Sequence, residues 1–168
     1  WYSWPLMIKP IAYFFENYTL VSNGASMIRN IHLFPNPALS LFSLMSIIIM
    51  SIHWLKLFTK WIKKGFIEKK FFILSFILLG YFCNLIPWFM VNRCTFIYHY
   101  EPASIFGFLA CSWYLSQWIE AKELGKKVFS WSILLIVLIA FLYWLPIQLG
   151  IPIESFQFYD RMWFLSWI

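Results

Sequence analysis

Residues 128–153, VFSWSILLIVLIAFLYWLPIQLGIPI, contain no charged side chain and are apolar along almost their whole length. A helix needs about 20 mostly apolar residues to cross the hydrocarbon core of a bilayer, so this run is long enough. A soluble amphipathic helix of the same length would show a polar stripe, which this run lacks. The stretch therefore predicts a transmembrane helix.

Three more runs lack charged residues, at 30–55, 71–92 and 102–119. Each exceeds the lower limit of about 17 residues for a span. We therefore expect an all-α membrane protein, a four-transmembrane-helix bundle with spans at about 37–55, 71–91, 102–119 and 128–149.

The composition supports a membrane protein. Of 168 residues, 62% are hydrophobic and only 12% are charged, and the mean hydropathy is +0.71. Typical soluble domains are about 45–50% apolar and about 25% charged. These values exclude a disordered chain, a secreted disulfide scaffold and most cytosolic enzymes. The sequence begins with Trp1 rather than Met, so we expect it to be part of a longer chain.

Lysines gather in the segments that follow the first and third runs, and the net charge is +6. By the positive-inside rule these two lysine loops face the cytoplasm, while both termini and the loop 92–101 face the non-cytoplasmic side. The nine basic residues on the cytoplasmic side are Lys56, Lys60, Lys63, Lys64, Lys69, Lys70, Lys122, Lys126 and Lys127. The four on the other side are Lys9, Arg29, Arg93 and Arg161.

Two segments flank the bundle, which we place at residues 36–153. In residues 1–35, two short apolar runs surround Ser22-Asn23-Gly24, which predicts a β-hairpin on the outer face. Residues 154–168 mix aromatic side chains with Asp160 and Arg161, a composition too polar to span and too aromatic for free solution. We expect this tail to lie along the outer membrane interface.

The outward loop 92–103, NRCTFIYHYEPA, concentrates functional groups between two spans. One interpretation is structural: Arg93 reaches lipid headgroups, the tyrosines join an aromatic belt, and Glu101 favours the N-terminus of the next helix. In the other, Arg93 and His99 hold the phosphate of a lipid-linked donor, because the guanidinium fork fits phosphate oxygens. Both interpretations stay open on the residue pattern alone.

The same loop resembles the hallmark outer loop in the C-terminal four-span region of protein O-mannosyltransferases. Residues 1–6, WYSWPL, are similar to the family's Trp-Pro-Leu motif. Asn36-Pro37 resembles the motif that opens the first span, although Pro35 replaces the usual glycine, and residues 159–168 are similar to the terminal motif. Glu101 departs from a position that is more often apolar.

This resemblance implies the C-terminal portion of a GT-C glycosyltransferase that transfers mannose from a polyprenyl-phosphate donor to Ser and Thr hydroxyls of proteins. We expect no cofactor, with the polyprenyl-phosphate mannose as donor substrate, and metal dependence stays open. The partners would be membrane lipids, the lipid-linked donor, acceptor proteins and the N-terminal half of the same enzyme, with no nucleic acid. The catalytic residues stay unidentified, because in this family the catalytic base belongs to that N-terminal half. The candidate substrate-binding residues are Arg93, His99, Tyr98, Tyr100, Arg161 and Trp163.

Other classes remain open: a non-catalytic lipid-handling or assembly module, and a GT-C transferase with a lipid acceptor. His32, His53 and His99 lack metal-ligand spacing, so we expect no metal site. Ala103, Gly107 and Cys111 recur every four residues, which predicts close helix packing. For the compartment we expect a bacterial inner membrane, or the endoplasmic reticulum membrane in a eukaryote.

Overall fold

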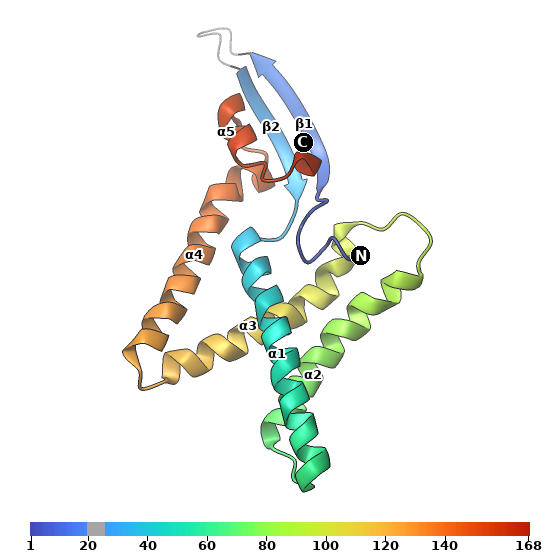
Figure 1. Cartoon of the computed structure of the whole chain (residues 1–168). Coiled ribbons are helices and arrows are strands. Elements are labelled where there is room, and N and C mark those ends of the chain that lie inside the picture. The colour runs from blue at the N-terminus through green and yellow to red at the C-terminus, as the bar shows by residue number, and fades with distance from the viewer. Residues whose placement is uncertain (20–25) are drawn as a thin grey trace.

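Four long helices account for most of the chain in the computed structural model, which describes residues 1–19 and 26–168. Figure 1 shows them as α1 (Pro37–Lys64), α2 (Lys69–Leu85), α3 (Glu101–Glu120) and α4 (Leu124–Leu149). The 3₁₀ helix η1 (Ile86–Met90) continues α2, and a second one, η2 (Ile97–Tyr100), leads into α3. Within the described residues, α1, the continuous stretch Lys69–Met90 and α4 are long and apolar enough to cross a membrane.

Helix α1 begins where the sequence predicts and ends nine residues later than expected. The Asn36 side chain accepts a hydrogen bond from the Leu39 amide (3.1 Å), and Pro37 occupies the first turn. The helix ends at Gly65, whose left-handed backbone (φ 65°) lets its amide bond the Trp61 carbonyl. The expected loop from Lys56 is therefore wrong over its first half, because lysine is a good helix former and no helix breaker precedes Gly65.

Helix α3 is not among the described helices that are long and apolar enough to cross a membrane, and it packs against the other three. Its second half carries Ser112, Tyr114 and Gln117, which lower its hydropathy. Its small face, Ala103, Gly107, Ala110 and Cys111, is buried. A Cβ on Gly107 would lie only 3.4 Å from the Ser43 Cβ of α1, so the two helices approach closely. The small-residue stripe expected from the sequence is thus confirmed as packing.

A three-stranded antiparallel sheet, ordered β1-β2-β3, makes the all-α expectation incomplete. Strand β1 (Ile11–Thr19) pairs with β2 (Ser26–Leu33) in a register from Ile11↔Leu33 to Thr19↔Ser26, with an irregularity after Ala12. The turn expected at Ser22-Asn23-Gly24 lies outside the described residues. Strand β3 (Ile153–Glu154) follows α4 and joins the free side of β2.

The segment after α4 folds back and packs against this sheet. It contains β3, the short helix α5 (Ser155–Asp160) and the 3₁₀ helix η3 (Leu165–Trp167). Phe158 and Trp167 are each only 1% exposed, and the Trp167 ring packs 4.9 Å from Phe34. Trp167 Nε1 donates to the Met7 carbonyl (2.7 Å), which holds Met7 in a left-handed backbone (φ 56°) unusual for a side-chain-bearing residue.

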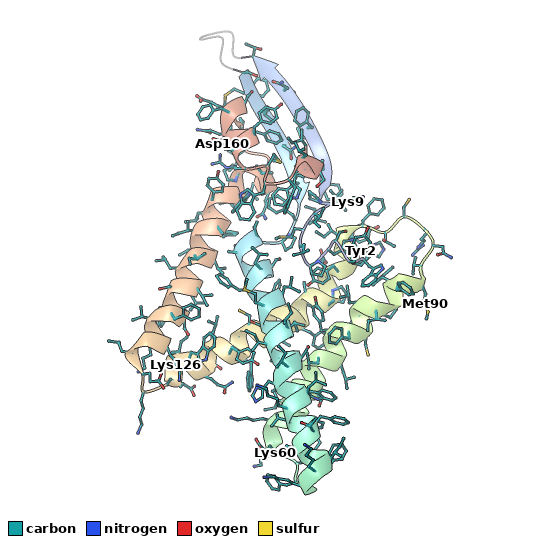
Figure 2. All side chains as sticks on the ribbon, viewed as in Figure 1. Tyr2, Lys9, Lys60, Met90, Lys126 and Asp160 are labelled. Atoms are coloured by element: carbon teal, nitrogen blue, oxygen red, sulfur yellow. The ribbon has the colours of Figure 1, made fainter. Side chains whose placement is uncertain are left out.

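The segments that connect the helices lie at two opposite ends of the molecule (Figure 2). At the lysine end lie the α1–α2 and α3–α4 connections, with Lys60 and Lys126 labelled in the figure. At the sheet end lie the three strands, Tyr2 and Met90, which precedes the loop 91–100. The lysines of these two connections and the loop 91–100 are therefore at opposite ends, whereas Lys9 lies at the sheet end.

Candidate functional site

Arg93 lies in the irregular segment between η1 and η2, at the sheet end. Its side chain is exposed. The ion pairs in the described part of the chain involve Arg29, Lys60 and Lys126, and Arg93 has no acidic partner there. The guanidinium is therefore available to an anion from outside the chain.

His99 is held between three aromatic rings. Its imidazole stacks on Tyr98 (4.2 Å between centroids), meets Trp88 edge-on (4.3 Å) and lies parallel to Trp4 (6.1 Å). Its Nδ1 lies 3.2 Å from the Phe96 amide, which donates to it, and 3.0 Å from the Phe96 carbonyl. These contacts fix the plane of the ring, so His99 is positioned rather than free to rotate.

The two tyrosines of η2 point in different directions. Tyr98 is 42% exposed, whereas Tyr100 is buried. The Tyr100 hydroxyl lies 3.1 Å from that of Tyr81 on α2, and burial raises the pKa of the Tyr100 phenol strongly. Tyr100 therefore stays protonated and ties η2 to α2.

A small cavity of ≈ 110 Å³ separates η2 from the segment that links β2 to α1. The linking segment is itself fixed, because the Asn36 side-chain amide donates to the Val137 carbonyl of α4 (2.9 Å). The cavity brings the Asn36-Pro37 region next to the loop 91–100. Its lining residues are Leu33, Phe34, Pro35, Ile97, Tyr98, Tyr100, Glu101 and Ser104.

Arg161 and Trp163 lie in the segment after α5, away from the loop 91–100. Arg161 donates to the carbonyls of Tyr143 (2.8 Å) and Gln157 (2.7 Å), and its guanidinium covers the Tyr143 ring at 4.4 Å. Trp163 packs edge-on against Trp144 (4.6 Å). Figure 2 shows the neighbouring Asp160 on the opposite side of the molecule from Met90. The six residues expected to bind substrate thus form two separate groups.

Sequence reasoning did not identify the partners of the loop residues. Trp4 comes from the N-terminal segment, and Tyr81 and Trp88 come from the stretch Lys69–Met90; no spacing connects them to residues 99 and 100. The Trp-Pro-Leu resemblance singled out the first of these segments but not its place beside His99.

The loop 91–100 offers a cation for anion binding, and the same loop carries an oriented imidazole. The described residues hold no group of three His, Cys, Asp or Glu side chains that could bind a metal ion. Glu101 lies on the cavity wall, and its side chain is exposed.

Comparisons with known proteins identify the family of this chain. A family model described as the C-terminal four TMM region of protein-O-mannosyltransferase matches residues 1–167. The chain is 29% identical over 90 residues to dolichyl-phosphate-mannose--protein mannosyltransferase 5 of Candida albicans, covering 54% of this chain and 12% of that protein.

Among solved structures, the chain resembles the S. cerevisiae protein O-mannosyltransferase Pmt1-Pmt2 complex bound to the sugar donor. The TM-score is 0.75 at 23% identity, covering 98% of this chain and 23% of that chain, so the likeness shows the fold. The chain spans only a small part of the length of either relative. The helices, the sheet-end motifs and the family match over residues 1–167 together show that the chain belongs to the protein O-mannosyltransferase family, as its C-terminal membrane region.

Proposed function

We propose that the enzyme containing this region transfers mannose from a polyprenyl-phosphate donor to Ser and Thr hydroxyls of proteins, and that this region walls the donor groove. One observation carries the proposal. The Trp4 segment and the loop 91–100, separate motifs in the sequence, meet around His99 at the end opposite the lysines. A phosphate site combines a cation with positioned polar groups, and the loop that carries His99 also carries Arg93.

In this proposal α3 also crosses the membrane, which makes four spans in all. The sheet end faces the non-cytoplasmic side. Helix α3 packs against α1, α2 and α4, and its charge-free run 102–119 exceeds the lower limit of about 17 residues for a span. The lysines at the other end favour the cytoplasm for that end. Because the relatives reported above are from Candida albicans and S. cerevisiae, we propose the endoplasmic reticulum membrane in place of a bacterial inner membrane.

Each candidate residue then has a distinct role. Arg93 binds the donor phosphate, His99 supports the same phosphate from a fixed position, and Tyr98 lines the site. Tyr100 holds η2 in place through Tyr81. Arg161 and Trp163 shape the outer-face groove from the α4 side, where they fix the segment after α4. The catalytic base and the acceptor contacts come from the rest of the enzyme.

Replacing Arg93 tests the proposal. In the full-length enzyme, Arg93→Ala should raise the KM for a labelled polyprenyl-phosphate-mannose donor by about 10- to 100-fold, as expected for one charged hydrogen-bonding partner. Arg93→Lys should recover only part of the loss, since an ammonium lacks the guanidinium fork.

The matched control is Arg29→Ala, which removes a cation from the same end. Arg29 already pairs with Glu16 (3.8 Å), so its loss should leave the donor KM unchanged. An unchanged donor KM in Arg93→Ala, or an equal effect in both variants, would refute the assignment of Arg93.

A further inference from the structure

A second polar cavity lies toward the lysine end, away from the loop 91–100. Its volume is ≈ 250 Å³, and it opens between α1 and α3. We call it the His53 cavity. Its lining residues are Ile49, Ile52, His53 and Lys56 of α1 and Tyr114 of α3.

One face of α1 lines this cavity with two apolar side chains, Ile49 and Ile52, followed by two polar ones, His53 and Lys56. The four α1 positions follow i, i+3, i+4 and i+7 spacing, so they share one side of the helix. Ile49 and Ile52 are 49% and 50% exposed, and they form an apolar approach from the membrane. His53 and Lys56 lie closer to the lysine end, and the His53 ring packs 6.2 Å from Trp113.

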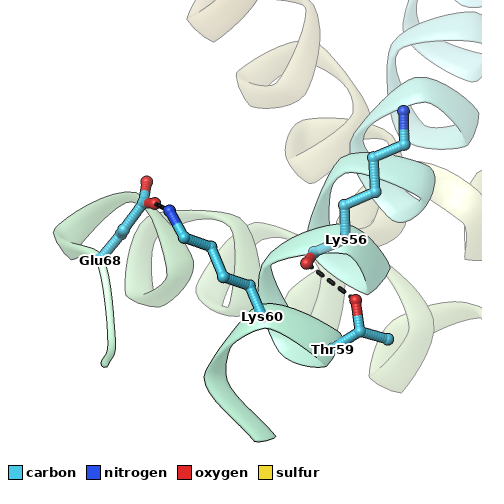
Figure 3. A network of polar contacts seen from close by, with 4 residues as sticks. All are labelled: Lys56, Thr59, Lys60 and Glu68. Carbon is cyan, nitrogen blue, oxygen red and sulfur yellow. Dashed lines mark hydrogen bonds and ion pairs between the residues drawn. The ribbon is translucent and has the colours of Figure 1, made fainter. Parts of the chain in front are cut away.

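The polar groups of the cavity can all donate hydrogen bonds. The Tyr114 hydroxyl is buried and has no hydrogen-bond partner among the described residues, which leaves an unsatisfied donor. Lys60, one turn after Lys56, is neutralised by Glu68, whereas Lys56 has no acidic partner in the described part of the chain. Figure 3 shows the Lys56 amine pointing away from the Lys60–Glu68 pair. Several donors without an acceptor favour an anion with more than one oxygen.

The depth of the cavity matches the headgroup layer. Lys56 is the twentieth residue of α1, counted from Pro37 (56 − 37 + 1), and about 20 helical residues cross the hydrocarbon core. The remaining two turns of α1 carry further lysines past this level. Basic clusters at this position attract anionic lipids.

We propose that the His53 cavity binds the phosphate of an anionic phospholipid in the leaflet at the lysine end. Lys56 and Tyr114 donate to the phosphate oxygens, His53 borders the headgroup, and one acyl chain lies along Ile49 and Ile52. The site is independent of the donor groove at the sheet end.

Equilibrium binding of a fluorescent phosphatidic acid to the full-length enzyme in neutral detergent tests this site. Lys56→Ala should raise the Kd by about tenfold, and Tyr114→Phe, which removes only the hydroxyl, should raise it severalfold. Lys63→Ala removes a charge from the same end outside the cavity, and should change the Kd less than about twofold. Unfolding midpoints of all variants should match the parent.

Two competitors separate the sources of phosphate. Unlabelled phosphatidic acid should displace the probe, whereas inorganic phosphate at the same concentration should not, because the acyl chain contributes to binding. Displacement by inorganic phosphate would show a site for a soluble anion and overturn the proposal. Equal losses in Lys56→Ala and Lys63→Ala, or binding that does not saturate, would show diffuse attraction and overturn it as well.

Discussion

The paired hydroxyls of Tyr81 and Tyr100 join α2 to η2 in the buried interior. Tyr100→Phe would leave the Tyr81 hydroxyl buried without its partner, at a cost of about 1–3 kcal/mol. Replacing both tyrosines by Phe removes both polar groups, so we expect the double variant to be more stable than either single variant. Thermal unfolding of the two single variants and the double variant in detergent measures these stabilities. Additive losses of stability in the double variant would contradict the pairing.

His32 gives the sheet a pH dependence. The side chain is buried in β2 and its Nδ1 contacts the Asn30 side-chain oxygen. Burial lowers the pKa of His32, and a backbone contact with Trp167 opposes this effect more weakly. The unfolded chain therefore binds the proton more tightly than the folded protein, so stability is complete above a pH of about 6.5 and falls as the pH drops below it.

His32→Gln checks this effect. The thermal unfolding midpoint of the parent should decrease when the pH is lowered from 7.5 to 5.5. The decrease should be smaller in the variant, because the glutamine side chain has no proton to gain. Parallel pH profiles would show that other groups cause the change.

Among single residues, the sequence singled out the members of one short loop and not their surroundings. Arg93, Tyr98 and His99 were recognised together because they share one short loop. The ring of Trp4 beside His99 could not be predicted, since a contact across 95 residues leaves no local pattern. The ring of Trp88 is nearer in sequence, but an irregular segment separates it from His99, so no periodic spacing connects the two. Arg161 was selected by resemblance alone, which carries no information on its distance from Arg93.

At the scale of helix pairs, Gly80 and Gly107 differ in the space that each leaves for a side chain. A Cβ on Gly80 of α2 would lie 2.1 Å from a ring carbon of Phe106 on α3, whereas one on Gly107 would meet Ser43 at 3.4 Å, an ordinary contact. Gly80→Ala should therefore destabilise the protein by about 1–3 kcal/mol through overpacking. Gly107→Ala should be nearly neutral, and unfolding midpoints in detergent compare the two.

A second change tests the cause of the Gly80 effect. Adding Phe106→Leu to Gly80→Ala removes the ring from the clash and should restore part of the lost stability. No recovery would mean that the ring is not what excludes a side chain at Gly80.

Helix positions were predictable because long charge-free runs have few other solutions in a membrane. Helix ends were less so: Lys56, Lys60 and Lys64 suggested a loop by charge, yet their intrinsic preference is helical, and Gly65 sets the end. Strand β3 was missed because two residues are too few for a periodic pattern, and its pairing with β2 is made across the whole bundle.

For the whole molecule, Trp167 is the contact that joins the most distant segments. It is 1% exposed, and its indole bonds the Met7 carbonyl. Trp167→Ala should reduce the free energy of unfolding by about 3–5 kcal/mol. Leu165→Ala, at a neighbouring position that is 90% exposed, should change it by less than about 0.5 kcal/mol. Similar losses in the two variants, measured by denaturant unfolding, would contradict this role.

The bond between Trp167 and Met7 also sets an order of events during synthesis. The Met7 amide donates to the Trp4 carbonyl (3.0 Å), and Met7 in turn is bonded to Trp167, 160 positions after it, so the segment whose indole lies beside His99 depends on that late residue. While a ribosome is still translating the intervening helices, this anchor does not yet exist. The wall around His99 is therefore completed only after all four helices have been made, and a nascent chain stalled before residue 167 inserts these helices without a finished site.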